Sequence, residues 1–261
     1  MIYFVAGGCS DCGRVREHNE DTFRIDSRRG LFVVADGMGG HASGEFASAL
    51  AVKTVFKALL CDKGSAAPGP CNAETLQTAI ELANSTIYQD AQVNPQRRGM
   101  GTTLTFMRWD RCQLYFGHVG DSRAYRLRGH ELLQLTRDHT WVDMQVRAGM
   151  LSQQEAEQAR MRHVLVKSLG TETGVEPDIV PVDVQTNDRF LLCSDGLSNL
   201  VDHKDLQAIL MGNGTPAAIS RHLVEKANAV GGQDNITAVV IDCYDNKWQA
   251  VLKSAINRIW R

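Results

Sequence analysis

The sequence predicts an α+β fold, a layered sandwich with mostly antiparallel β-sheets. Short runs rich in β-branched and aromatic residues recur along the chain and end at Gly or Asp, as strands do. Amphipathic helical segments occur in pairs between groups of strands and do not follow each strand in turn. This grouping is typical of an α+β architecture and not of strict β-α alternation.

Eight segments are predicted to be strands. They are 2–6, 22–25, 31–35, 102–108, 113–119, 123–128, 190–193 and 236–242. Only Gly120, Asp121 and Ser122 separate two of them, and this short spacing predicts that 113–119 and 123–128 pair as a β-hairpin.

Five segments are predicted to be helices. They are 44–60, 73–92, 141–149, 153–161 and 215–229, with a Gly- and Pro-rich loop at 62–70 between the first two. Asn72 would cap the second helix, and Pro216 would stand in the first turn of the fifth. Ser152 and Glu155 have the spacing of a capping box at the start of the fourth.

Composition places the chain among ordinary globular proteins. It has 261 residues, of which 43% are apolar and 22% charged, and its net charge of −2 does not favour a nucleic-acid partner. We find no apolar run near the ~18 residues that a membrane span needs, and the N-terminus is a poor signal peptide. Seven scattered cysteines indicate a reducing compartment, so we expect a cytoplasmic location.

Several acids stand at strand ends or in glycine turns. Asp36 ends an apolar run and precedes three glycines within four residues and then His41; comparable acids are Asp21, Asp121, Asp195 and Asp234. A single Asp-Gly is most simply a turn, but several suggest that the carboxylates converge and need a cation. Oxygen ligands select Mg²⁺ or Mn²⁺. Calcium competes, although the EF-hand spacing is absent, and the Gly-Met-Gly-Gly run lacks the register of a phosphate loop.

Seven motifs, in order, resemble those of the protein phosphatase 2C family. They are SDCGRVREHNED (10–21), VVADGMGGH (33–41), GMGTTL (99–104), GHVGDSRAY (117–125), LTRDHTWV (135–142), LLCSDGLSN (191–199) and GGQDNITAVV (231–240). The resemblance covers roughly residues 3–243 and looks like the bacterial branch of these metal-dependent serine/threonine phosphatases. It implies two antiparallel sheets flanked by pairs of helices on their outer faces.

The resemblance also implies a role for each motif residue around two Mn²⁺ or Mg²⁺ ions. Asp36 would bridge both metals, the Gly37 carbonyl would bind one, and Asp195 and Asp234 would bind the other. Asp121 would join Asp195 in a third, weaker site, and Glu20 and Asp21 would act through water. Arg16 would hold the substrate phosphate, and His41 would protonate the leaving oxygen. A two-metal centre activates water directly, which suits a chain with no obvious Ser-His-Asp or Cys-x5-Arg arrangement.

Other readings of these residues stay open. Arg16 could pair with Glu17 or Asp21 for structure alone, and His41 could be an ordinary surface residue. The same fold could also serve as a catalytically silent regulatory module, or act on small phosphate esters. As partners we expect phosphorylated proteins, the substrates of a serine/threonine kinase in the same cell.

Two regions are predicted along the chain. Residues 1–245 would form the catalytic domain, with a flap at about 140–170 beside the cleft, and 246–261 would form a C-terminal amphipathic helix. Apolar residues of this helix fall on one face: Trp248, Val251, Leu252, Ala255, Ile256 and Ile259. The helix would either pack on its own domain or dock on a partner or an anionic membrane surface.

Overall fold

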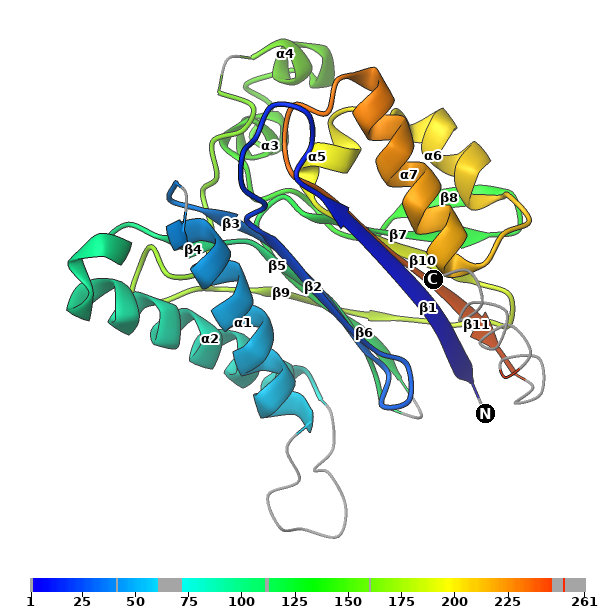
Figure 1. Ribbon diagram of the computed structural model, residues 1–261, viewed down its shortest axis with the longest axis horizontal. Coiled ribbons are helices and arrows are strands. Elements are labelled where there is room, and N and C mark those ends of the chain that lie inside the picture. Colours follow the sequence, from blue (N-terminus) through cyan, green and yellow to red (C-terminus); the bar gives the residue numbers. More distant parts are fainter. Residues whose placement is uncertain are drawn as a thin grey trace, which may run out of the picture.

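Two antiparallel sheets stack face to face in the computed structural model of this chain, which describes residues 2–40, 42–60, 72–110, 113–159, 161–245 and 251 (Figure 1). The first sheet has the strand order β1 (Tyr3–Asp11), β11 (Ile236–Tyr244), β10 (Arg189–Cys193), β7 (Arg123–Arg128) and β8 (Glu131–Gln134). The second has the order β2 (Asp21–Asp26), β3 (Leu31–Met38), β5 (Leu104–Trp109), β6 (Leu114–Val119) and β9 (Asp178–Val182), and β4 (Gly101–Thr102) pairs with β3.

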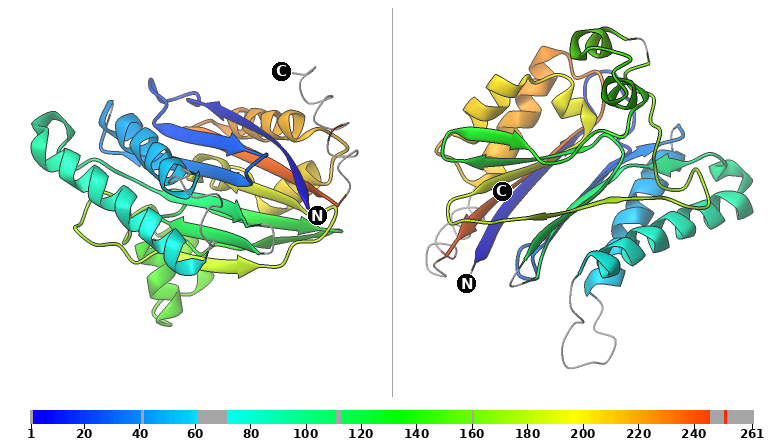
Figure 2. Two further views of the ribbon diagram at one scale, coloured as in Figure 1. Left: turned by 90° about the horizontal axis from the view of Figure 1, so that it is seen from below. Right: turned by 180° about the vertical axis from the view of Figure 1, so that it is seen from behind.

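Pairs of helices cover both outer faces of the sandwich (Figure 2). The second sheet is covered by α1 (Ala42–Leu60) and α2 (Ala73–Val93), and the first by α6 (His203–Leu210) and α7 (Pro216–Val230). Shorter helices are α3 (Trp141–Arg147), α4 (Gln153–Gln158), α5 (Asp195–Ser198) and the 3₁₀ helix Pro95–Arg97. The predicted α+β sandwich with flanking helix pairs is therefore confirmed.

Strand β3 shows why its apolar run is continuous. Leu31, Val33 and Ala35 belong to the core between the second sheet and helices α1 and α2. Phe32 and Val34 belong to the core between the two sheets. Successive side chains point to opposite faces of a strand, so a strand with both faces covered is apolar at every position. This burial, at about 1.5–3 kcal/mol for a large side chain, fixes the end of β3 and the residues that follow it.

The features predicted at three helix starts are confirmed, whereas α1 begins at Ala42, two residues before its predicted start. The Asn72 side chain accepts a hydrogen bond from the Thr75 amide, and Pro216 stands in the first turn of α7. At α4, Ser152 and Glu155 form both bonds of the capping box. Helix α4 ends at Gln158, three residues before the predicted end.

The predicted hairpin of residues 113–119 and 123–128 is wrong. Strand β6 pairs with β5 and β9 in the second sheet, whereas β7 pairs with β10 and β8 in the first. Residues 120–122 thus cross from one sheet to the other, with Gly120 at a φ of 109°. A short Gly-Asp turn can join strands in two different sheets as well as neighbouring strands of one sheet. The local sequence does not distinguish these two connections. The crossing places Asp121 at the edge between the sheets.

Five elements were not predicted: β8, β9, α5, α6 and the 3₁₀ helix Pro95–Arg97. Pro181 interrupts the apolar run of β9, and proline is tolerated there because β9 is an edge strand whose outer side pairs with no other strand of its sheet. Among the described helices, none has the length and apolar character needed to cross a bilayer. The predicted C-terminal helix falls outside the described residues except for Val251.

Candidate metal centre

The predicted site residues converge on one cleft. It has a volume of about 950 Å³ and is lined by Arg16, Glu20, Asp36, Gly37, Asp121, Asp195 and Asp234, among others. These residues come from five separate regions of the chain and from the ends of strands in both sheets. Asp21 is buried and is not among the lining residues, and His41 falls outside the described residues.

The main chain of Asp36 is held from both sides. Its N–H donates to Thr103 Oγ1 at 2.9 Å, and its carbonyl accepts from Thr102 Oγ1 and the Thr103 N–H, both at 2.8 Å. Thr103 is buried, and its hydroxyl also shares a 2.7 Å hydrogen bond with Ser122. The residue after β3's apolar run is therefore fixed in place before any ion binds.

Asp21 stands directly opposite Asp36 in the register of β2 and β3. It is buried, and Ser194 Oγ donates to its Oδ2 at 2.7 Å. Its Oδ1 has no hydrogen-bond partner at normal geometry among the described residues. A buried carboxylate oxygen without a donor is costly, so this oxygen is suited to a water that belongs to an ion's shell.

Asp195 and Asp234 are brought together by neighbouring strands. Asp195 follows β10, and Asp234 precedes β11, which pairs with β10. A Cβ on Gly196 would lie 2.0 Å from the Asn235 carbonyl oxygen, so only glycine allows the two turns to approach this closely. The carboxyl groups of Asp195 and Asp36 lie within hydrogen-bonding reach of each other.

Burial and mutual repulsion disfavour the ionised acids. Burial raises the pKa of Asp21 to about 7 and the pKa of Asp121 to about 8, and the charges of neighbouring aspartates add to both shifts. Burial followed by the charge of nearby aspartates likewise raises the pKa of Asp36 well above its ordinary value, and raises the pKa of Asp195. Such a cluster is stable in its ionised form only beside a compensating positive charge.

The donor set fits a hard divalent cation. It consists of carboxylate oxygens with a main-chain carbonyl at Gly37, and Mg²⁺ and Mn²⁺ prefer such ligands. In the parts of the chain that the structure describes, no three Asp, Glu, His or Cys side chains are arranged to hold an ion by themselves. Ions here would therefore keep several waters, as Mg²⁺ commonly does.

Arg16 reaches the edge of the acidic cluster. Its Nη2 lies 2.9 Å from Asp234 Oδ2, and the side chains are 55% and 39% exposed. Among the described residues, Arg16 thus pairs with Asp234 and not with Glu17 or Asp21. Exposed pairs contribute about 0–1 kcal/mol, so the guanidinium can exchange this partner for another anion at little cost.

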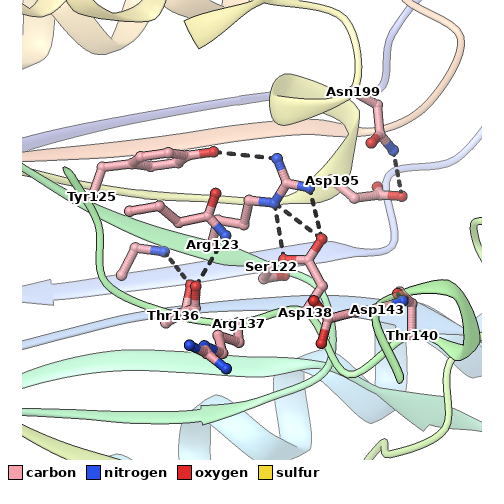
Figure 3. Close-up of polar contacts among 12 residues, drawn as sticks. Ser122, Arg123, Tyr125, Thr136, Arg137, Asp138, Thr140, Asp143, Asp195 and Asn199 are labelled. Atoms are coloured by element: carbon pink, nitrogen blue, oxygen red, sulfur yellow. Dashed lines mark hydrogen bonds and ion pairs between the residues drawn. The ribbon is translucent and has the colours of Figure 1, made fainter. Parts of the chain in front are cut away.

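A permanent cation that sequence reasoning missed lies behind the site (Figure 3). Arg123 Nε and Nη2 both bond to Asp138, with the shortest contact at 2.6 Å, and Arg123 Nη1 reaches Tyr125. Its charge lowers the pKa of Asp121 and of Asp195, against the dominant effect of burial. Arg123 is the first residue of β7, whose sequence RAYRLR contains two further arginines, so the local sequence does not single it out.

The segment predicted to be a flap also contributes side chains to the cleft, and these were not predicted. Arg162 and His163 line the cleft, and Arg162 Nε donates to His163 Nε2 at 2.9 Å. The segment is tied to the sandwich by main-chain bonds from Trp141 to Val164 and from Val166 to His139, both at 2.8 Å. Side chains of this segment therefore line the same cleft as Asp195.

An α+β sandwich whose cleft gathers buried carboxylates beside an arginine is the arrangement of a metal-dependent phosphoesterase. The family described as Protein phosphatase 2C matches residues 11–228 of this sequence. The chain belongs to the protein phosphatase 2C family.

Relatives and solved structures agree with this assignment. The chain is 38% identical over 240 residues to the serine/threonine phosphatase stp of Listeria monocytogenes, covering 89% of this chain and 93% of that protein. It is 37% identical to the crystallised serine/threonine phosphatase PstP/Ppp of Mycobacterium tuberculosis, with a TM-score of 0.84 over 92% of this chain and 98% of that one. A structure of the PstP catalytic domain in complex with two manganese ions has a TM-score of 0.83 at 36% identity, over 94% and 100% of the two chains.

Proposed function

We infer that the chain is a metal-dependent protein serine/threonine phosphatase. The observation that carries this inference is the convergence of Asp36, Asp195 and Asp234 in one cleft, with the Arg16 guanidinium 2.9 Å from Asp234. The similar proteins named serine/threonine phosphatases, one of them holding two manganese ions, support it.

The acids of the cleft would hold the two ions. Asp36 would be shared between both, Gly37 would offer its carbonyl to one, and Asp195 and Asp234 would bind the other. Asp121 would belong to a third, weaker site, and Glu20 and Asp21 would act through water. When bound, two divalent ions supply Lewis acidity for the direct attack of water on phosphorus.

Arg16 would bind the phosphate of the substrate. Its planar guanidinium offers paired donors that match two phosphate oxygens, and its exposed pairing with Asp234 leaves it free to turn toward a ligand. His41, which follows the glycines after Asp36, would protonate the serine or threonine oxygen as it leaves.

Two other functions are compatible with this fold. A silent binding module would keep the fold without hydrolysis, but the acids that metal catalysis needs are all present in the sequence. A small-molecule phosphoesterase would have the same centre with another substrate. Several expectations stay predictions. They are that the substrates are proteins phosphorylated by a kinase of the same cell, that nucleic acid is not a partner, and that the location is cytoplasmic. The domain limits 1–245 and 246–261 and a docking role for the C-terminal helix also stay predictions.

Phosphate release from a phosphothreonine peptide, compared with release from a small aryl phosphate, tests the proposal. We expect hydrolysis of the peptide with Mn²⁺ or Mg²⁺ and none with EDTA. Hydrolysis of the aryl ester alone would favour the small-molecule function. No release from folded protein with either metal would favour the binding module.

A further inference from the structure

The Asn235 side chain fastens a distant segment of the chain. Asn235 is 5% exposed and directly follows Asp234. Its Nδ2 donates to the carbonyl oxygens of Cys12 at 3.1 Å and of His18 at 2.9 Å. Its Oδ1 accepts the Glu20 N–H at 2.8 Å. One amide therefore bonds to both ends of residues 12–20.

Residues 12–20 form the connection from β1 to β2, and they carry Arg16. The middle of this connection is exposed and has no regular secondary structure. Main-chain groups in such a segment need partners from elsewhere in the protein. Asn235 supplies three of them at once and so fixes the distance between the two ends of the loop.

Two close main-chain contacts join the same segments. The Arg14 N–H donates to the Gly232 carbonyl at 2.6 Å. Gly13 has a φ of 81°, and a Cβ there would lie 2.3 Å from the Asp234 carbonyl oxygen. Glycine thus lets the loop lie directly against residues 232–235, and this contact brings the Arg16 guanidinium to Asp234.

We propose that Asn235 is a positioning residue that sets the place of Arg16 beside the metal-binding carboxylates. This inference rests on the proposed function, in which Arg16 binds the substrate phosphate. Both amide hydrogens and the amide oxygen of Asn235 are engaged with the main chain of the loop. Asn235 therefore acts on the substrate through Arg16.

Asn84 provides a matched control elsewhere in the molecule. It is 1% exposed, its Nδ2 faces the carbonyls of Glu172 at 3.0 Å and Thr173 at 3.3 Å, and its Oδ1 accepts the Gly170 N–H at 2.8 Å. Asn84→Ala removes the same three kinds of bond as Asn235→Ala, and Asn84 does not line the cleft. Any effect shared by the two variants reports lost stability alone.

Limited trypsin digestion tests the loop itself, without use of activity. Trypsin cleaves after Arg14 and Arg16, and cleavage there requires the loop to open. At a temperature where both variants stay folded, we expect Asn235→Ala to be cut at these positions about tenfold faster than wild type, as a loss of roughly 1.4 kcal/mol of loop stability would give. Asn84→Ala should be cut there at the wild-type rate. Equal rates for Asn235→Ala and wild type would overturn the proposal.

A double-mutant cycle tests whether Asn235 acts through Arg16. With Mn²⁺ and a phosphothreonine peptide, we expect kcat/KM of the Arg16→Ala, Asn235→Ala double variant to match Arg16→Ala within about twofold. Any loss of kcat/KM in Asn84→Ala should instead multiply with the loss in Arg16→Ala. Losses of Asn235→Ala and Arg16→Ala that multiply would contradict the proposal. A wild-type protein that hydrolyses no phosphopeptide would contradict the proposed function, and trypsin digestion would still decide whether Asn235 holds the loop.

Discussion

Asp21 and Asp36 face each other as directly paired residues of β2 and β3, with both side chains at the cleft end of the second sheet. Like charges at opposed positions of two strands destabilise a sheet. Burial and this neighbouring charge also raise the pKa of Asp36 well above its ordinary value. The pairing is a stable arrangement when the acids are protonated, or when a cation lies close to them.

The stability of the metal-free protein should therefore fall as pH rises from about 4 to 8. The native pKa of Asp21 is about 7 and that of Asp121 about 8, whereas both are near 3.8 in the unfolded chain. The native state thus holds protons that the unfolded chain has already released, and this advantage is lost as pH passes the native values. Thermal unfolding in EDTA between pH 5 and pH 8 measures the effect.

Manganese should reverse this trend. Bound cations favour the ionised acids, so the rise in Tm on adding Mn²⁺ should be larger at pH 8 than at pH 5.5. An ion at a hundred times its Kd contributes about 2.7 kcal/mol per site. Each kcal/mol raises Tm by roughly 2–4 °C in a domain near this size, so each bound ion should raise Tm by about 5–11 °C. The same rise at both pH values would contradict the raised pKa values of the acids.

Removing the Thr103 hydroxyl should weaken metal binding. Thr103→Val keeps the side-chain shape but leaves the buried Asp36 N–H without its acceptor, at a cost of about 1–3 kcal/mol. Loss of a residue that orients a ligand lowers metal affinity about 10–100-fold. Calorimetric titration with Mn²⁺ measures this change. Thr103→Ser retains the hydroxyl and should bind Mn²⁺ nearly as wild type does; equal affinities for the Val and Ser variants would count against the assigned role.

Truncating Arg123 should destabilise the protein far more than truncating its neighbour on β7. Arg123→Met leaves the Asp138 carboxylate without the cation that now bonds it through two nitrogens. The two side chains are 25% and 16% exposed, so the loss should approach about 3–5 kcal/mol, the cost of losing one partner of a fully buried pair. Arg126→Met removes a pair with Asp183, which is 65% exposed, and should cost less than about 1 kcal/mol for that pair. Urea unfolding compares the two; similar midpoints would show that the Arg123–Asp138 pair contributes little.

Arg16 should matter for phosphate binding and little for the fold. Arg16→Ala removes an exposed pair, so the free energy of unfolding should change by less than about 1 kcal/mol. Loss of a charge-assisted contact to phosphate, about 1.5–3 kcal/mol, should lower kcat/KM about 10–150-fold. Arg16→Lys keeps the charge without the paired donors and should lie between wild type and Ala. An unchanged kcat/KM in Arg16→Ala would contradict a role of Arg16 in binding the substrate phosphate.

Local sequence predicted much of this molecule, because strand ends and helix caps are local features. The apolar run before Asp36 and the capping residues Asn72 and Ser152 each specify an element within a few residues. The motif order then placed Asp36, Asp195 and Asp234 in one cleft, as the structure finds.

The features that were missed depend on partners outside their own strand or turn. The crossing at Asp121 looks like a hairpin until the strands on either side find different sheets. The role of Arg123 depends on Asp138, and that of Asn235 on Cys12 and His18, more than 200 residues earlier. No local pattern specifies such contacts.

Phosphate release from a phosphothreonine peptide by wild type and by Asp36→Asn tests the central claim most directly. The measurement is made with Mn²⁺, with Mg²⁺ and with EDTA, on protein shown to be folded. We expect metal-dependent release by wild type. Mutation of a residue that only supports a metal ligand lowers metal affinity or activity by up to about 100-fold. Because Asp36 would bind both ions directly, Asp36→Asn should lower release by at least that factor. Equal release by the two proteins, or release that persists in EDTA, would contradict a metal centre built on Asp36.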